Sequence, residues 1–142
     1  MKNFFLKKLH VQNWLYRHHL GLLAKVIYKY NRIVYSCDIP PSVKIGKNCL
    51  FPHHALGVVI HPKSIIGDNC RIYQNVTIGS KDTSGGGPKV GNNVFIGAGA
   101  CVLGRIEIGD NVVIAANSVV LNSSECDVLL AGVPANVKKK II

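Results

Sequence analysis

The sequence predicts a mainly β fold, a left-handed parallel β-helix preceded by a short α-helical segment. Three observations carry this prediction. Large apolar residues recur every six positions. Glycine often follows such a residue directly, and a small or β-branched residue stands four positions after it. A period of six matches neither the 3.6 of a helix nor the alternation of an ordinary strand, but it fits a short strand plus a turn. Three such units close a triangular coil of about 18 residues, and stacked coils bury a common inner column.

The repeat keeps its phase through three runs of apolar positions. These are Ile39, Ile45 and Phe51; Ile60, Ile66, Ile72 and Ile78; and Val90, Ile96, Val102, Ile108, Ile114 and Val120. Glycine adopts backbone angles that other residues resist, so we expect it to form the turns. Cys49 and Cys70 fall on inward-facing small positions, where we expect core filling and not metal binding. The pattern places the β-helix at residues 37–131.

Two interruptions break the period. Three extra residues, Gly57–Val59, follow the two histidines of the segment FPHHALGVVIHP with two residues in between. A polar, glycine-rich segment, GSKDTSGGGPK at residues 79–89, lacks apolar residues where the repeat requires them. Such an excursion on a rigid column is either a plain surface loop or a place where function resides.

The two ends differ from the repeat. Residues 1–36 have a helical composition with basic and aromatic residues interleaved, and Gly21 is expected to divide two short helices. These helices are expected to cap the first coil, which would otherwise present an open sheet edge. The same residues also suit a basic amphipathic surface that contacts anionic lipid, and the two roles are compatible. Residues 132–142 are expected to form a basic tail.

The charge and cysteine content limit the possible partners and locations. The net charge is +10, and +7 of it lies in residues 1–37, which contain no acidic residue. This excess fits an anionic partner, but no nucleic-acid recognition motif accompanies it. The five cysteines form no CxxC pair, and we find neither a signal peptide nor an apolar run long enough to span a bilayer. We therefore expect a cytoplasmic protein, and a position at the inner face of the membrane is compatible with this charge.

Several segments resemble the serine acetyltransferase branch of the hexapeptide-repeat acyltransferases. They are DIPPSVKIGKNC, PHHALGVVI, IGDNCRIYQNVTIG, VFIGAGACVLGRIEIGDNVVIAANSVV and AGVPA, and together they cover residues 37–137. The resemblance implies a homotrimer that uses acetyl-CoA as acyl donor, with an active site in each cleft between neighbouring columns. Cyclic three-fold assembly is compatible with a column that has flat faces.

The resemblance assigns a general base and its partner. His54 matches the catalytic histidine of the family, and Asp38 matches the carboxylate that orients it. Residues 18 apart stack on adjacent coils, so a separation of 16 should also place Asp38 and His54 on neighbouring rungs near one edge. A histidine that titrates near neutrality can remove the proton of an acceptor hydroxyl. A carboxylate on its other ring nitrogen fixes the tautomer. His53 and His61 are expected to line the acceptor pocket, with His53 on the opposite side of the strand.

The remaining predicted contacts concern the acyl donor. Backbone N–H groups near Gly79 and Ser80 are candidates for stabilising the oxyanion. By resemblance, Ala98 and Ala116 would contact the pantetheine arm, and Lys138 in the Lys138–Lys140 run would suit the phosphates of CoA. No metal is expected.

Departures from the family pattern bear on the acceptor. Serine-acetylating members have an Arg-His-Pro-Lys-like segment whose arginine binds the carboxylate of the amino acid. This chain has GGGPK at that place. Without that cation a sugar hydroxyl fits better than free serine, as in enzymes that acetylate capsule, O-antigen or exopolysaccharide. Serine O-acetylation is the alternative.

Two other classes of function compete with acyl transfer. Similar columns that resemble γ-class carbonic anhydrases hold zinc with three histidines, but no histidine follows His61. A purely structural column would need neither Asp38 nor His54. An O-acetyltransferase remains the favoured prediction.

Overall fold

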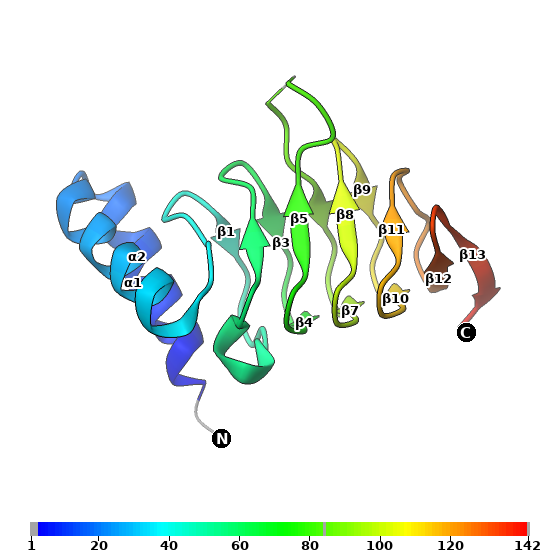
Figure 1. Ribbon diagram of the computed structural model, residues 1–142, viewed down its shortest axis with the longest axis horizontal. Helices are drawn as coiled ribbons and strands as arrows, with labels where there is room; N and C mark the ends of the chain where they lie inside the picture. The colour runs from blue at the N-terminus through cyan, green and yellow to red at the C-terminus, as the bar shows by residue number, and fades with distance from the viewer. Residues whose placement is uncertain (1–2, 84, 142) are drawn as a thin grey trace.

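The protein is a three-sided parallel β-helix with two α-helices at its amino-terminal end, as its computed structural model shows (Figure 1). The structure describes residues 3–83 and 85–141. In Figure 1 the chain runs up the near face of the column, crosses behind it at the top and advances from left to right. This path makes the coil left-handed, so the predicted fold class is confirmed.

The strands form three faces, which we name after one strand of each. The β5 face contains β2 (Val59–Ile60), β5 (Thr77–Gly79), β8 (Cys101–Leu103) and β11 (Val119–Val120). The β6 face contains β1 (Lys44–Ile45), β3 (Ile65–Ile66), β6 (Lys89–Val90) and β9 (Glu107–Ile108). The β7 face contains β4 (Arg71–Ile72), β7 (Phe95–Ile96), β10 (Val113–Ile114), β12 (Val128–Gly132) and β13 (Ala135–Lys140).

The inner column consists of the residues that the six-residue period marks. Ile60, Ile72 and Ile96 are no more than 1% exposed, and each is the second residue of its strand. Cys49 and Cys70 are fully buried in the same cluster, as expected for core residues. Burial of branched aliphatic side chains against one another is the main favourable contribution to the stability of such a column.

The turns use asparagine where the sequence suggested glycine. Six asparagines have φ between +55° and +59°, in the left-handed region: Asn48, Asn69, Asn75, Asn93, Asn111 and Asn117. The glycines of the repeat serve a different purpose. A Cβ atom on Gly67 would lie 2.5 Å from the carbonyl oxygen of Gly91 on the next coil. Glycine is therefore required because the coils approach closely, and asparagine provides the left-handed backbone.

The strand register locates the two interruptions. Val59 pairs with Thr77, which is 18 residues further along the chain, as in an uninterrupted coil. Lys44 pairs with Ile65, so this coil contains three extra residues, and they are accommodated by η1 (Pro52–Ala55), a 3-10 turn. Thr77 pairs with Cys101, so the next coil contains six extra residues in the segment that connects β5 to β6.

The helices α1 (Phe4–Arg17) and α2 (Gly21–Tyr35) pack against the first coil. Phe5, Leu6 and Leu9 of α1 join the core cluster of the column. Polar side chains of α1 also bond to carbonyl groups of that coil. The amide of Gln12 donates to the Ile39 oxygen at 2.9 Å, and that of Asn13 donates to the Pro41 oxygen at 2.9 Å. Carbonyl groups of the first coil, which no preceding coil can pair, thus find partners.

The carboxyl-terminal segment differs from the expected tail. Residues 135–140 form β13, which pairs antiparallel with β12 and extends the β7 face at the far end of the column. The sequence did not predict this strand, because three consecutive lysines do not show the apolar pattern of a strand. The strand is held mainly by backbone hydrogen bonds, which any side chain permits.

Replacing Ile66 by alanine is expected to lower the free energy of unfolding by about 2–5 kcal/mol, because it leaves a cavity in the inner column. Ile66 is 2% exposed, whereas its neighbour Ile65 on the outer side of β3 is 36% exposed. Ile65→Ala is the matched control, with an expected cost below about 1 kcal/mol. Urea unfolding at one protein concentration measures both. Equal costs would mean that the inside and outside of β3 are assigned wrongly.

Thiol reactivity is expected to separate the cysteines by burial. Burial, with a smaller contribution from the negative charge of Asp38, raises the pKa of Cys37 to about 11. The hydrogen bond with Cys49, and after it burial, raises the pKa of Cys70. At pH 8 the thiol of Cys37 is about one part in a thousand thiolate. Cys126 is exposed and should react first with a disulfide reagent, while Cys37, Cys49 and Cys70 should react only in denaturant. The Cys126→Ser variant should lose the fast phase, and fast reaction of the buried three would contradict the assignment.

Candidate active site

The double histidine lies in an unusual turn at one edge of the column. His53, His54 and Ala55 in η1 have φ of +56°, +55° and +59°, so three consecutive residues with side chains are left-handed. Such backbone costs energy and persists only where the surroundings fix it. Ala55 is fully buried, the Gly57 N–H donates to the Ser36 oxygen at 2.9 Å, and the Asn75 N–H donates to the Leu56 oxygen at 2.9 Å.

This turn changes the expected orientation of the histidines. The sequence suggested that His53 and His54 alternate across a strand, but they lie in the turn and both are exposed. The prediction of alternation was wrong because the three extra residues of the coil are placed here, where no strand forms.

The imidazole of His54 packs against the amino-terminal helices. Its ring stacks on Tyr35 with centroids 5.2 Å apart and an interplanar angle of 15°, and Phe5 contacts it edge-on at 6.2 Å. The hydroxyl of Tyr35 accepts a hydrogen bond from Nζ of Lys8 at 2.9 Å. Within residues 3–83 and 85–141, no hydrogen bond or ion pair involves the His54 ring. One exposed imidazole is thus held by ring contacts, with its nitrogens open to a ligand.

Within residues 3–83 and 85–141 no hydrogen bond joins Asp38 to His54. The carboxylate of Asp38 accepts a hydrogen bond from the Tyr28 hydroxyl at 2.5 Å and another from Arg32 at 3.0 Å, in an ion pair that is partly exposed. Asp38 pairs with Val59, 21 residues along, because η1 lengthens the coil. The expectation that residues about 18 apart stack on neighbouring coils was therefore incorrect for this coil. A direct hydrogen bond between Asp38 and His54 stays a prediction, and it requires the carboxylate to leave Tyr28 and Arg32.

The partners of Asp38 show the influence of its charge. Partial burial raises the pKa of Tyr28, and the hydrogen bond to Asp38 raises it further. The pKa of Arg32 is raised by its hydrogen bond to Tyr28 and by the negative charge of Asp38. A cavity of about 280 Å³ lies beside this group, lined by Arg32, Ser36, Cys37, Asp38 and Val59.

Ala98 and Ala116 lie on the same edge of the column as His54, which we call the His54 edge. This edge comprises the turns that lead into the β5 face, at residues 52–58, 73–76, 97–100 and 115–118. The Asn117 N–H donates to the Ala98 oxygen at 2.9 Å, so the two turns stack directly. Small side chains at both positions keep the edge open along successive coils.

Gly79, Ser80 and His61 lie on another edge, where the chain leaves the β5 face. We call it the loop edge, because residues 80–83 and 85–88 project from it, and Figure 1 shows these residues and η1 at opposite ends of the β5-face strands. The Gly79 oxygen accepts from the Gly104 N–H at 2.9 Å, and the Ser80 hydroxyl donates to the Asp82 oxygen at 2.5 Å. Nδ1 of His61 accepts from the Lys63 N–H at 3.2 Å.

The loop edge has a basic cavity that the sequence did not reveal. It has a volume of about 320 Å³ and is lined by Lys63, Gly86, Gly87, Lys89, Arg105, Ile106 and Glu107. The Arg105 side chain lies so close to Gly86 that a Cβ there would be 2.0 Å from its Cγ. Lys89 forms an exposed ion pair with Glu107 at 3.3 Å. Three cations and one carboxylate make this cavity suitable for an anionic group.

Some contacts around the site were not predicted from the sequence. Tyr35 and Lys8 lie in the helical segment, which carries no six-residue period, so nothing marked their approach to His54. Arg105 stands at an ordinary turn position, and only the fold brings it beside Gly86. Lys138 is exposed on β13, the strand at the end of the β7 face.

We searched the described part of the chain for side chains that could bind a metal ion together. Residues 3–83 and 85–141 contain no group of three or more histidine, cysteine, aspartate or glutamate side chains that could hold an ion.

Comparisons with known proteins agree with this architecture. A family model described as bacterial transferase hexapeptide (six repeats) matches residues 87–122. A serine acetyltransferase of Synechococcus elongatus is 40% identical over 69 residues, which cover 49% of this chain and 28% of that protein. One from Mycobacterium tuberculosis is 41% identical over 73 residues, covering 51% and 31%.

Solved structures match over nearly the whole chain. The serine acetyltransferase of Brucella abortus superposes with a TM-score of 0.91 at 34% identity, covering 96% of this chain and 56% of that one. The structure of the same enzyme in complex with coenzyme A gives 0.91 at 34% identity, covering 95% and 54%. This chain thus spans about half the length of those proteins. The repeat, the fold and these similarities support a hexapeptide-repeat acyltransferase of the serine acetyltransferase branch.

Proposed function

We propose that the protein is an acetyl-CoA-dependent O-acetyltransferase in which His54 is the general base. The observation that carries the proposal is the exposed His54 imidazole, held by Tyr35 and bonded to no described residue. It lies on the edge that also contains Ala98 and Ala116, the predicted contacts of the pantetheine arm. The similarity to a serine acetyltransferase solved with coenzyme A supports acetyl-CoA as the donor.

The chemistry requires one proton transfer and one acyl transfer. A ring nitrogen of His54 accepts the proton of the acceptor hydroxyl while the oxygen attacks the thioester carbonyl carbon. The tetrahedral intermediate collapses, the C–S bond breaks, and the CoA thiolate leaves and takes up the proton from the imidazolium. The Tyr35 ring under the imidazole fixes its plane, so that the nitrogen does not have to be oriented in each turnover.

The complete site is proposed to need more than one copy of the chain. The backbone N–H groups near Gly79 and Ser80 are the candidates for binding the oxyanion, but they lie on the loop edge, across the β5 face from His54. In a homotrimer, the His54 edge of one copy can meet the loop edge of the next. Lys138 would then be available to the CoA phosphates only if β13 borders the same cleft.

Serine is the acceptor that the comparisons support better. The curated relatives carry that substrate in their names. The sequence argued against serine because the segment 79–89 lacks the family's arginine. The structure weakens that argument, because Lys63 and Arg105 bring cations to the cavity at the base of the segment. A carboxylate can therefore be neutralised there by residues outside the segment.

A sugar hydroxyl is the second candidate. The observation in its favour is the presence of Gly86-Gly87 at the place of the family's Arg-His pair, so the segment itself carries no cation there. The hydroxyl of a surface-polysaccharide acceptor is uncharged and needs no cation. The two candidates differ in whether Arg105 contributes to binding.

The His54→Gln variant is expected to lower kcat by about a hundredfold to ten-thousandfold, because glutamine cannot accept the hydroxyl proton. Loss of thioester absorbance with serine and a panel of sugars measures the rate. His53→Gln is the matched control, since it alters the adjacent exposed histidine of the same turn. Activity that survives in His54→Gln but fails in His53→Gln would reassign the base.

The Arg105→Gln variant is expected to raise the KM for serine about tenfold and to leave the KM for acetyl-CoA unchanged, because the charged contact to the carboxylate is lost. Lys44→Gln on the β6 face is the control for an exposed cation elsewhere. Turnover of a sugar that is insensitive to Arg105→Gln, with none of serine, would favour the polysaccharide acceptor.

A further inference from the structure

The outer side of the α1–α2 hairpin carries a large apolar surface. Leu22 and Ile33 are 79% and 81% exposed. Further apolar and aromatic side chains of the hairpin are 48–66% exposed: Phe4, Val11, Trp14, Leu23, Val26, Tyr30 and Val34. Only Ala24 and Asn31 of α2 are buried. A helix that leaves most of its apolar residues in water usually has another surface to contact.

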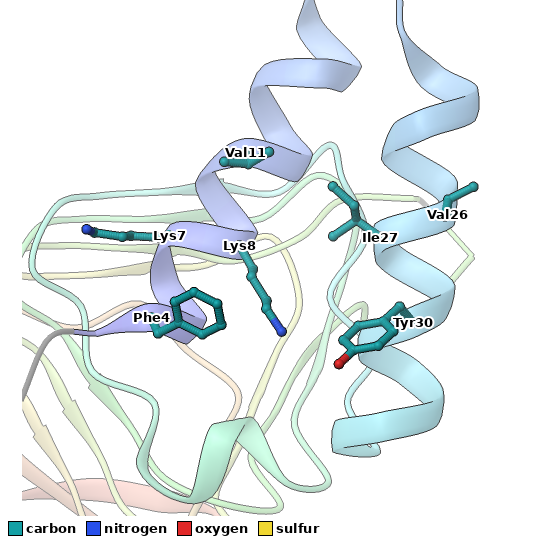
Figure 2. Close-up of a pocket in the computed structure, with 7 residues that line it drawn as sticks. All are labelled: Phe4, Lys7, Lys8, Val11, Val26, Ile27 and Tyr30. Carbon is teal, nitrogen blue, oxygen red and sulfur yellow. The ribbon is translucent and has the colours of Figure 1, made fainter.

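A groove runs between the two helices on this surface. It has a volume of about 470 Å³ and is lined by Phe4, Lys7, Lys8, Val11, Val26, Ile27 and Tyr30 (Figure 2). Figure 2 shows the Lys8 side chain extending between the helices toward Tyr30. Its ammonium group lies 4.7–4.9 Å from the ring centroids of Phe4, Tyr30 and Tyr35. The groove thus combines an apolar lining with cations.

The charge of the hairpin is of one sign. Residues 3–37 contain Lys7, Lys8, Arg17, Lys25, Lys29 and Arg32 and no acidic residue. An apolar surface bordered by lysine and arginine matches the boundary between acyl chains and anionic headgroups. Trp14 and Tyr30 have amphipathic rings of the kind that is enriched at this depth.

A second copy of the chain is a poorer occupant of the same surface. A face-to-face pair would bring these cations together, with no acidic side chain of either hairpin to oppose them. No helix among the described residues is long and apolar enough to cross a membrane.

We propose that the α1–α2 hairpin docks on the surface of an anionic lipid bilayer, with acyl chains against the groove and phosphate headgroups at Lys7, Lys25 and Lys29. This inference does not depend on the proposed acetyl transfer, because it concerns binding alone. The contact from Lys8 through Tyr35 to His54 means that docking would hold the candidate base close to the bilayer surface.

The test uses the full chain and vesicles of phosphatidylcholine with and without phosphatidylglycerol. Trp14 is the only tryptophan and is 54% exposed on this surface, so its emission reports contact directly. We expect a blue shift and co-sedimentation with the phosphatidylglycerol vesicles and neither with phosphatidylcholine alone. Binding should weaken as salt is raised.

Two variants probe the surface. Lys25→Glu/Lys29→Glu should weaken binding at least about tenfold, because two cations that would face the anionic headgroups become anions. Ile33→Gln should weaken it by removing an exposed apolar contact while leaving the fold intact. Lys138→Glu/Lys139→Glu makes the same charge change on β13 and should have little effect.

Three results would overturn the proposal. The first is no blue shift and no co-sedimentation with phosphatidylglycerol vesicles. The second is loss of binding only in the Lys138→Glu/Lys139→Glu variant, which would assign the lipid contact to β13. The third is a lower sedimentation mass of Ile33→Gln in the absence of lipid, which would show that copies of the chain cover this surface.

Discussion

The close stacking of successive coils is the constraint on which the rest of the structure depends. The carbonyl oxygen of Gly91 lies only 2.5 Å from the position that a Cβ of Gly67 would take, and the same crowding recurs at Gly46, Gly97 and Gly109. This approach lets each strand bond in parallel to the strand one coil away and seals the isoleucine column from water. Because the column is rigid, any residue placed on an edge keeps a fixed relation to residues on the same edge of neighbouring coils.

Function is proposed to lie where this regularity is broken. Each interruption occupies an edge: η1 presents His54, and the segment between β5 and β6 adjoins the basic cavity. Three left-handed residues in η1 are maintained by the turn of the next coil and by Ser36, so the rigid column holds a backbone that would be strained in isolation. The helical hairpin completes the surroundings of His54 through Tyr35 and Phe5.

Much of the fold could be predicted because the period of six is local and repeats many times. Ile60, Ile72 and Ile96 are buried as the period requires, and a single sequence suffices to show it. The repeat glycines, such as Gly67, were expected to form the turns, but they are required because neighbouring coils approach closely. The sequence of a single coil does not reveal this crowding. The partners of Asp38 and the placement of Arg105 depend on how far each insertion shifts the register. That shift is visible only when the strands are paired.

The most direct test of the central claim is a crystal structure of the protein with coenzyme A bound. The account predicts three copies around an axis, with the CoA sulfur beside the His54 ring of one copy and Gly79–Ser80 of its neighbour, and the pantetheine arm along Ala98 and Ala116. Coenzyme A bound away from the His54 edge, or held wholly by one chain with no neighbour at the cleft, would contradict it.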